Sequence, residues 1–245
     1  MIERPQISII IPAYNEERFI ADAILSVKQQ TPEPLETIVV ANSCTDRTAE
    51  IARDYGAKVI ETPVQGISYA KNLGAREARG DVLAFMDADC KMQEGLTEAV
   101  VRTVLKGYDG GKAKIVIYDD TSLKAKAIDL FRDVTSRALE RVQNLDYSGT
   151  GAFTFATREL FKKIENFYGE GWNTNKKVLE DIDFHMRIKK HGRYKYLTEA
   201  CALTSARRFL EEGYLSCYVE DAIHGVLPWK DNIRGRWQKK TEVSS

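Results

Sequence analysis

The 245-residue chain contains 36 Lys and Arg residues and 36 Asp and Glu residues, so its formal net charge is zero. Hydrophobic residues make up 43% of the chain and charged residues 29%, as in an ordinary water-soluble globular protein. Proteins that bind nucleic acid normally carry a basic excess, so this balance argues against nucleic acid as a partner.

The sequence also bears on where the protein works. Its apolar runs fall short of the ~20 residues that a membrane-spanning helix needs, and the N-terminus leads into a strand-like run without a signal-peptide pattern. The four cysteines are far apart and form no CxxC pair, which favours reduced thiols. We expect a cytoplasmic protein. The basic stretch from Lys230 to Lys240 would allow at most peripheral contact with the inner face of a membrane.

Strands and helices alternate through the first ~90 residues. Runs of apolar, β-branched residues predict strands, and apolar residues at helical spacing predict helices. The predicted strands cover residues 7–11, 35–41, 57–60 and 82–86, and the predicted helices cover 19–27, 46–55 and 68–79. This alternation is typical of an α/β fold with a parallel sheet and helices on both faces.

The second half of the chain is less regular. Helices are predicted over residues 94–106, 123–145 and 178–191, and strands over 112–118 and 149–156. The sequence contains neither an internal repeat nor a linker-like segment. We therefore expect a single domain, with a nucleotide-binding lobe at about residues 1–120 and an acceptor-side lobe at about 121–245.

An apolar stripe runs along the predicted helix 123–145. Its members recur at helical spacing: Leu123, Ala127, Leu130, Phe131, Val134, Ala138, Val142 and Leu145. Packing into the core is the first interpretation, and an apolar face for a lipid-linked acceptor is the alternative.

Two aspartates follow the predicted strand 82–86, in the sequence Asp87-Ala88-Asp89. Side chains two residues apart on an extended chain point the same way, so both carboxylates can face one ion. Ligands bind at the carboxyl ends of parallel strands, and Mg²⁺ typically takes one or two protein carboxylates. An isolated D-x-D pattern is a weak signal, with a solvated acidic turn as the alternative.

Three other segments of the chain contain candidate site residues, and each alone has a simple structural explanation. Pro12-Ala13-Tyr14-Asn15-Glu16 follows the first strand, where Asn15 can cap the next helix. The segment from Gly66 to Gly74 can be a plain helix with a glycine at each boundary. Glu180-Asp181-Ile182-Asp183-Phe184 opens a late helix, where the macrodipole favours acidic residues.

Together and in this order, these segments resemble the family 2 glycosyltransferases of the GT-A fold, over residues 7 to about 215. Segment 12–16 matches the family motif that packs around the nucleotide base and ribose. Segment 66–74 matches G-x-x-x-A-x-N-x-G, with Lys71 where Arg is common. Asp87-Ala88-Asp89 matches the metal-binding D-x-D, and segment 180–187 matches E-D-x-D-L-x-x-R. Segment 204–209 is also similar to one found in many members.

The resemblance implies a nucleotide-sugar donor and a divalent metal, Mg²⁺ or Mn²⁺. Asp89 would contact the metal directly, helped by Asp87 through ribose or water. Arg207 and Arg208 would clamp the diphosphate, with a basic surface turn as the alternative. The donor-binding residues are expected to be Pro12, Ala13, Tyr14, Asn15, Glu16, Asn42, Lys71, Asp87, Ala88, Asp89, Arg207 and Arg208.

The resemblance also makes Asp181 the general base that takes a proton from the acceptor hydroxyl, in one direct attack that inverts the anomeric carbon. Partial burial at the edge of a cleft is expected to raise the pKa of Asp181. Asp183 and Arg187 are four residues apart, so we predict that they form an ion pair on the helix surface. The loop 169–175 before this helix would close over the substrate, with Trp172 as a stacking platform.

Some identities stay open. Asn42 stands where the family often has aspartate, so a UDP-sugar is favoured and GDP-mannose remains possible. The acceptor is a glycan, a lipid-linked molecule or a small molecule. One alternative enzyme is a sugar-1-phosphate nucleotidyltransferase, but the glycine-rich, arginine-containing loop that it has after the first strand is missing here. Another alternative is a catalytically silent protein that only binds a nucleotide sugar. The presence of Asp87, Asp89 and Asp181 together argues against it, because such a protein would not need all three.

Overall fold

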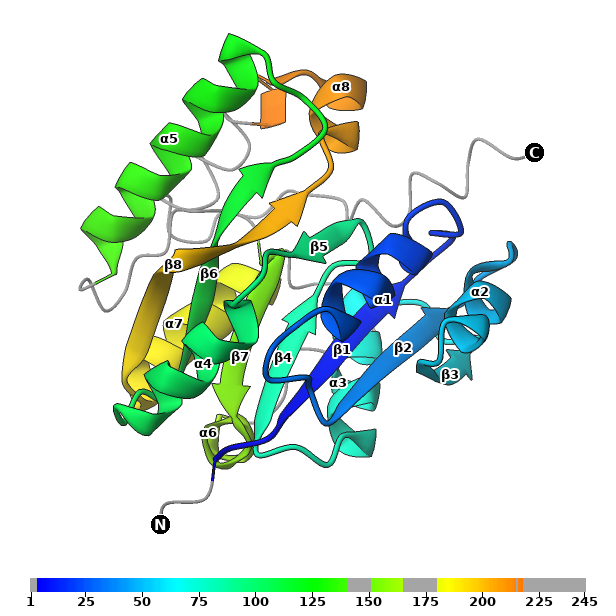
Figure 1. The fold of residues 1–245 in the computed structure, drawn as a ribbon, viewed down its shortest axis with the longest axis horizontal. Helices are drawn as coiled ribbons and strands as arrows, with labels where there is room; N and C mark the ends of the chain where they lie inside the picture. Colours follow the sequence, from blue (N-terminus) through cyan, green and yellow to red (C-terminus); the bar gives the residue numbers. More distant parts are fainter. Residues whose placement is uncertain (1–3, 141–150, 165–179, 215, 218–245) are drawn as a thin grey trace.

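A computed structural model describes residues 4–140, 151–164, 180–214, 216 and 217, apart from the side chain of Ile182. An eight-stranded sheet runs through these ranges, with helices on both of its faces (Figure 1). The strands are β1 (Ile7–Ala13), β2 (Glu36–Asn42), β3 (Lys58–Thr62), β4 (Val82–Met86), β5 (Cys90–Met92), β6 (Gly110–Ile117), β7 (Phe153–Thr157) and β8 (Tyr194–Thr204). The helices are α1 (Ile20–Lys28), α2 (Thr48–Asp54), α3 (Ile67–Glu77), α4 (Leu96–Leu105), α5 (Leu123–Leu139), α6 (Arg158–Lys163), α7 (Glu180–His191) and α8 (Arg207–Glu212).

The strand order is β3-β2-β1-β4-β7-β6-β8-β5. The first four strands in this order pair in parallel, as the sequence predicts. β7 then runs antiparallel to both β4 and β6, β6 and β8 are parallel, and β5 closes the far edge antiparallel to β8. The sheet is therefore parallel in its N-terminal half and mixed beyond it.

Strand β1 lies at the centre of the parallel half and is buried on both faces. Ile9 and Ile11 pack in one apolar cluster with α1, α2 and α4, while Ile10 packs in a second cluster with α3, α6 and α7. Such double burial explains why the strand reads as a continuous apolar run. On the second face, a Cβ at Gly74 of α3 would lie 2.5 Å from Ile10 Cγ2. Glycine at this position therefore lets α3 approach the sheet closely.

Sequence reasoning missed four short or late elements: β5, α6, β8 and α8. β5 has only three residues and depends on its pairing with β8, from Cys90 opposite Thr204 to Met92 opposite Ala202. Several predicted elements also have different bounds in the structure; for example, the strand predicted at 149–156 begins at Phe153, and that predicted at 112–118 begins at Gly110. Residues 141–145 of the predicted long helix lie outside the described part of the chain.

The apolar stripe of α5 does not pack into the core. Leu123, Leu130 and Val134 are 84%, 65% and 55% exposed, so the core-packing interpretation is wrong for them. The helix instead buries Ala125 and Ile128, in a small cluster that includes residues of β6 and α8. Among the helices in the described ranges, none combines the length and hydrophobicity needed to cross a membrane.

Candidate active site

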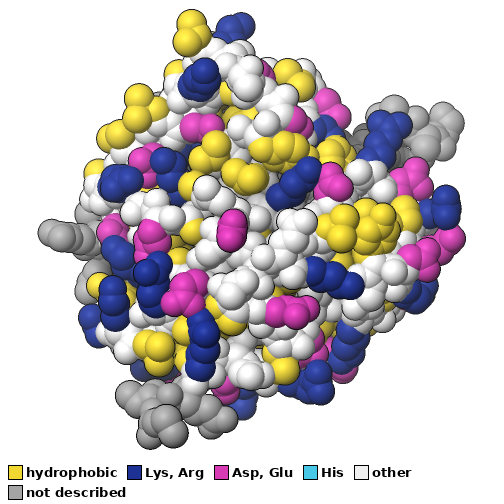
Figure 2. Space-filling model, viewed as in Figure 1, with side chains coloured by type: hydrophobic (Ala, Val, Ile, Leu, Met, Phe, Trp, Pro, Cys, Tyr) yellow, Lys and Arg dark blue, Asp and Glu magenta, His cyan; other side chains and the backbone are white. Residues whose placement is uncertain are grey.

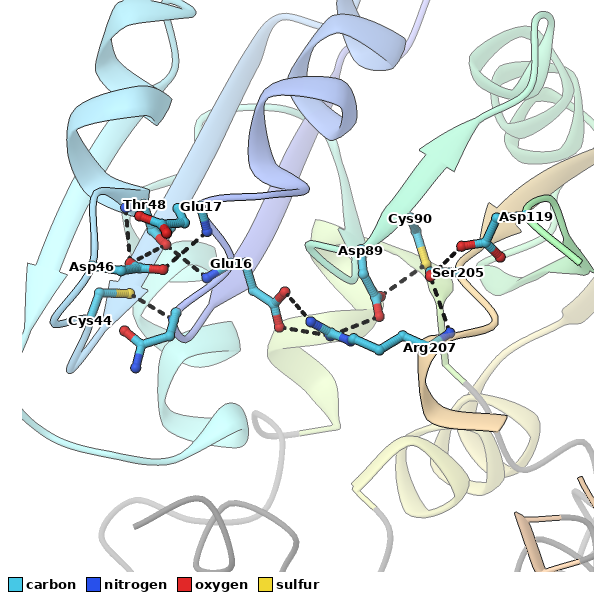
Figure 3. Close-up of polar contacts among 11 residues, drawn as sticks. Glu16, Glu17, Cys44, Asp46, Thr48, Asp89, Cys90, Asp119, Ser205 and Arg207 are labelled. Atoms are coloured by element: carbon cyan, nitrogen blue, oxygen red, sulfur yellow. Dashed lines mark hydrogen bonds and ion pairs between the residues drawn. The ribbon is translucent and has the colours of Figure 1, made fainter. Parts of the chain in front are cut away.

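The loops that follow β1 and β2 bind each other. Asn15 adopts a positive φ of 54°, which asparagine tolerates better than most residues. Its Oδ1 accepts a hydrogen bond of 2.8 Å from the backbone N–H of Thr45, and the N–H of Glu16 donates to Thr48 Oγ1 at 2.8 Å. Figure 3 shows the hydrogen bond between Glu16 and Thr48 that joins the two loops. They hold segment 12–16 at the carboxyl end of β1, where the sequence predicts donor-binding residues.

Asn42, at the end of β2, is fully buried. Its Nδ2 donates to Val64 O at 2.5 Å, and its Oδ1 accepts from the Gly66 N–H at 3.0 Å. Both polar groups of the amide thus hold the segment that leads into α3. A direct contact between Asn42 and the nucleotide base stays a prediction, and the structure gives this residue a supporting role.

Asp87 and Asp89 lie just beyond β4, and the Asp87 N–H donates to Ala152 O at 3.1 Å. One ligand atom each from Asp87, Asp89 and Cys90 lie within 4.8 Å of one another. Burial raises the pKa of the Cys90 thiol well above its usual range, so this residue stays neutral. Two carboxylates beside a neutral thiol suit Mg²⁺ or Mn²⁺ better than a soft metal that selects thiolates.

Arg207 joins this acidic pair to the first loop. Its guanidinium lies 2.8 and 2.9 Å from the two carboxylate oxygens of Glu16 and 3.0 Å from Asp89 Oδ2 (Figure 3). Arg208 instead pairs with Glu212, 3.5 Å away and one turn further along α8. The structure thus brings Arg207, and not Arg208, into contact with predicted site residues.

The position of Arg207 depends on strand pairing and on an aspartate that sequence reasoning missed. Cys90 pairs with Thr204, so the chain enters α8 beside the Asp87–Asp89 loop. Asp119 then accepts a hydrogen bond from Ser205 Oγ at 2.6 Å (Figure 3) and another from the Ala206 N–H at 2.5 Å. Asp119 follows a strand with no motif around it, so the sequence carried no signal for this role.

Lys71 of α3 is almost completely buried, with 2% of its side chain exposed. Its ammonium lies 2.6 Å from Asp181 Oδ1 and 3.2 Å from Glu180 Oε1, both on the first turn of α7. Asp181 retains 18% exposure, so the lysine holds its carboxylate without burying it completely.

Gly151 approaches the other side of the Asp181 carboxylate. Its N–H donates to Asp181 Oδ2 at 3.1 Å. A Cβ at position 151 would lie 2.3 Å from Asp181 Cγ, closer than real Cβ contacts come. Only glycine fits this position without moving the aspartate, and the sequence alone gave no reason to single it out.

The charges around this cluster shift two carboxyl groups in opposite directions. Burial by itself would raise the pKa of Asp181, but the Lys71 ammonium outweighs it and holds that pKa below its usual range. The expectation of a raised pKa for Asp181 was therefore wrong. Burial also raises the pKa of Asp87, and here it prevails over Lys71, with the charge of Asp181 adding to the effect.

The neighbouring aspartate on α7 has a different role. Arg187 Nε donates to Asp183 Oδ2 at 2.7 Å, which confirms the predicted ion pair. Asp183 is buried within this pair, so the predicted location on the helix surface was wrong. The loop 169–175 with Trp172 lies outside the described residues.

Similarity to known proteins identifies the family to which this chain belongs. Residues 8–183, more than two thirds of the chain, match the family model described as Glycosyl transferase family 2. A 4,4'-diaponeurosporenoate glycosyltransferase of Staphylococcus haemolyticus is 39% identical over 120 residues, which cover 46% of this chain and 32% of that protein. The chain spans less than a third of the length of the first curated relatives it matches.

Solved structures show a similar fold. The mannosyltransferase PcManGT from Pyrobaculum calidifontis, in complex with GDP-Man and Mn²⁺, superposes with a TM-score of 0.65 at 20% identity, over 93% of this chain and 67% of that one. Glucosyl-3-phosphoglycerate synthase from Mycobacterium tuberculosis, with Mn²⁺, UDP and phosphoglyceric acid, gives 0.56 at 21% identity, over 92% and 80%. The fold is thus the GT-A fold that the sequence predicts, and, by its match to the family model, the chain belongs to glycosyl transferase family 2.

Proposed function

We propose that this protein transfers one sugar at a time from a nucleotide-sugar donor to an acceptor hydroxyl, with inversion and with Asp181 as the general base. The observation that carries the proposal is the Lys71 contact. One buried ammonium lies 2.6 Å from Asp181 and also acts electrostatically on Asp87. The candidate base and the candidate metal-binding loop therefore belong to one charged cluster.

The same cluster supports a divalent metal. Its side chains include five carboxylates and two cations, the latter being Lys71 and Arg207; the carboxylates are those of Glu16, Asp87, Asp89, Glu180 and Asp181. Asp89 and Asp87 would hold Mg²⁺ or Mn²⁺, which suits this excess of negative charge. When bound, the metal would neutralise charge on the leaving diphosphate.

In the proposed step, the acceptor oxygen forms a bond to the anomeric carbon as the bond from that carbon to the diphosphate oxygen breaks. The bonding electrons leave with the nucleoside diphosphate, and the acceptor proton passes to Asp181. Lys71 and the Gly151 N–H hold the Asp181 carboxylate in its ionised form, the form that accepts a proton. A single attack from the opposite side inverts the anomeric carbon.

Donor and acceptor are proposed at the level of chemical class. PcManGT was solved with GDP-Man and Mn²⁺, and the mycobacterial synthase with UDP and Mn²⁺, which supports a nucleotide sugar and a metal here. We favour a UDP-sugar, with GDP-mannose as the other candidate donor. The acceptor is a hydroxyl-bearing glycan, lipid-linked molecule or small molecule.

The test is a panel of nucleotide sugars, each assayed with Mn²⁺, Mg²⁺ or chelator for release of nucleoside diphosphate. We expect one donor class to be turned over, only with metal. Asp181→Asn should still bind that donor in calorimetry but lose turnover by at least about 100-fold. Asp183→Asn on the same helix serves as the comparison and should keep turnover once its thermal stability is checked. Equal turnover with chelator, or a fully active Asp181→Asn, would reject the proposal.

A further inference from the structure

We propose that the outer face of α5 is a docking surface for an anionic lipid bilayer. This face consists of the exposed residues of the helix: Leu123, Lys124, Lys126, Ala127, Leu130, Val134, Arg137 and Ala138. The inference goes beyond sugar transfer and does not depend on it, because binding to a bilayer needs no substrate.

The apolar part of this face forms a line along the helix. Leu123, Ala127, Leu130, Val134 and Ala138 are spaced four, three, four and four residues apart, the spacing that keeps side chains on one side of a helix. The three large side chains are more than half exposed. From Leu123 to Val134 the line extends about 17 Å at 1.5 Å per residue, long enough to lie along a membrane surface.

The charges of α5 are sorted between its two sides. The outer face carries three cations: Lys124, Lys126 and Arg137. Every residue of α5 is described, and neither of its two acids belongs to this face. Asp129 accepts the backbone N–H of Ile117, at 3.1 Å from Oδ2.

Asp133, the second acid, also points inward. It retains only 13% exposure, and its carboxylate accepts the Tyr196 hydroxyl at 3.1 Å and lies 3.5 Å from Lys114 Nζ. Arg137 is bound to it at 3.1 Å, so the two lysines carry most of the outward charge. Apolar side chains flanked by cations are the pattern of helices that lie in the interface of an anionic membrane. Figure 2 shows apolar and basic side chains, with some acidic ones among them, where α5 lies in Figure 1.

The helix is fixed to the body of the protein on its other side. Ser122 caps it by accepting the N–H of Ala125 at 3.2 Å, and the Arg132 guanidinium stacks on Phe209 of α8, 4.7 Å from the ring centre. Ala125 and Ile128 pack in the cluster that includes Ile117. The docking surface is therefore preformed, so binding would not have to order a flexible segment.

Charge complementarity favours a bilayer over a second copy of the chain. A twofold-symmetric contact through α5 would place the same patch on both sides of the interface. Lys124 and Lys126 of one copy would then approach the cations of the other, which is unfavourable. Anionic headgroups instead attract each lysine while the acyl region accepts Leu130 and Val134.

The test is co-sedimentation of the full chain with vesicles of phosphatidylcholine alone, or of phosphatidylcholine with phosphatidylglycerol. We expect binding to the anionic vesicles only, weakened by added salt. Leu130→Gln combined with Val134→Gln should reduce binding at least about tenfold, since both side chains lose their apolar burial. Lys124→Gln combined with Lys126→Gln should reduce it about fivefold for each lysine.

Control variants change exposed apolar and basic residues elsewhere on the protein. Leu25→Gln with Leu105→Gln removes two exposed leucines, and Lys28→Gln with Lys106→Gln removes two exposed lysines. Both controls should bind vesicles as the unaltered protein does. The proposal is overturned if the unaltered chain does not bind anionic vesicles. It is also overturned if the α5 variants bind vesicles as the controls do, which is the result expected if the basic stretch Lys230–Lys240 were responsible for vesicle binding. A dimer in light scattering that the Leu130/Val134 variant abolishes, without vesicle binding, would also overturn it in favour of a second copy.

Discussion

The Lys71 ammonium lies 2.6 Å from the Asp181 carboxylate, across 110 residues of sequence, and only 2% of the lysine side chain is exposed. This ion pair fixes both the position and the charge of the candidate base. It also sets the sign of the first prediction, because burial and Lys71 act on Asp181 in opposite directions.

Lys71→Gln should raise the pKa of Asp181, since burial then acts without the opposing cation. A base with a raised pKa is protonated over more of the acidic range, so the acidic limb of the kcat profile should move to higher pH. Lys71→Arg keeps the cation, uses the residue common in the family, and should leave the limb near its original position. A profile that is unchanged in Lys71→Gln would show that the lysine has only a structural role.

Gly151→Ala should displace the Asp181 carboxylate, because the new Cβ would lie 2.3 Å from its Cγ. A misplacement of about 1 Å can cost about 100-fold in rate. We expect kcat to fall by that order while the donor dissociation constant, measured by calorimetry, stays within about twofold, since the Gly151 N–H donates to the base. Loss of donor binding in a folded variant would contradict this division of roles.

Arg207→Gln should increase the affinity of the protein for Mn²⁺ in the absence of nucleotide. The guanidinium lies 3.0 Å from Asp89 Oδ2, so it opposes a cation at that carboxylate. Electron paramagnetic resonance of free Mn²⁺ measures this affinity without turnover. Arg208→Gln is the matched control, because Arg208 pairs with Glu212, and it should leave Mn²⁺ binding unchanged. Weaker Mn²⁺ binding in Arg207→Gln would disprove the competition.

Asp87→Asn should stabilise the protein in chelator. The folded-state pKa of Asp87 is raised, so the folded protein holds this proton to higher pH than the unfolded chain does. The stability contributed by the protonated group is complete below the unfolded pKa of ~3.9 and is lost as pH rises toward the folded value.

The amide cannot ionise and so avoids that loss. The stability gained by the variant should therefore grow above pH ~4, and each 1 kcal/mol gained should raise Tm by about 2–4 °C. Asp22→Asn, which removes an exposed aspartate, should change Tm little. A lower Tm for Asp87→Asn at neutral pH in chelator would show that the charged carboxylate is stabilising. With Mn²⁺ present, we expect the order to reverse, because the variant loses a candidate ligand.

The sequence predicted the elements whose signal is local. The apolar run of β1 and the helical spacing of α1 both reflect burial against near neighbours. It missed β5, since three residues carry too little pattern to mark a strand that only pairing with β8 creates.

The candidate site divides in the same way. Segments such as 87–89 and 180–183 can be recognised in the sequence because their acidic residues lie within a few positions of one another. The contacts that give them their properties are long-range, such as Glu16 with Arg207 and Gly151 with Asp181. The exposed stripe of α5 shows a further limit. Helical spacing groups Leu123, Leu130 and Val134 on one side, but it does not say whether that side faces the protein.

The pairing of β5 with β8 has a consequence for how such enzymes can be altered. It joins the acidic loop to a strand and helix that come after residue 183, where the match to the family model ends. Exchanging residues 205–212 between relatives would therefore remodel the wall beside Asp89 while leaving the parallel half of the sheet intact. A graft at this junction would test whether these residues affect the proposed donor or acceptor preference on an unchanged scaffold.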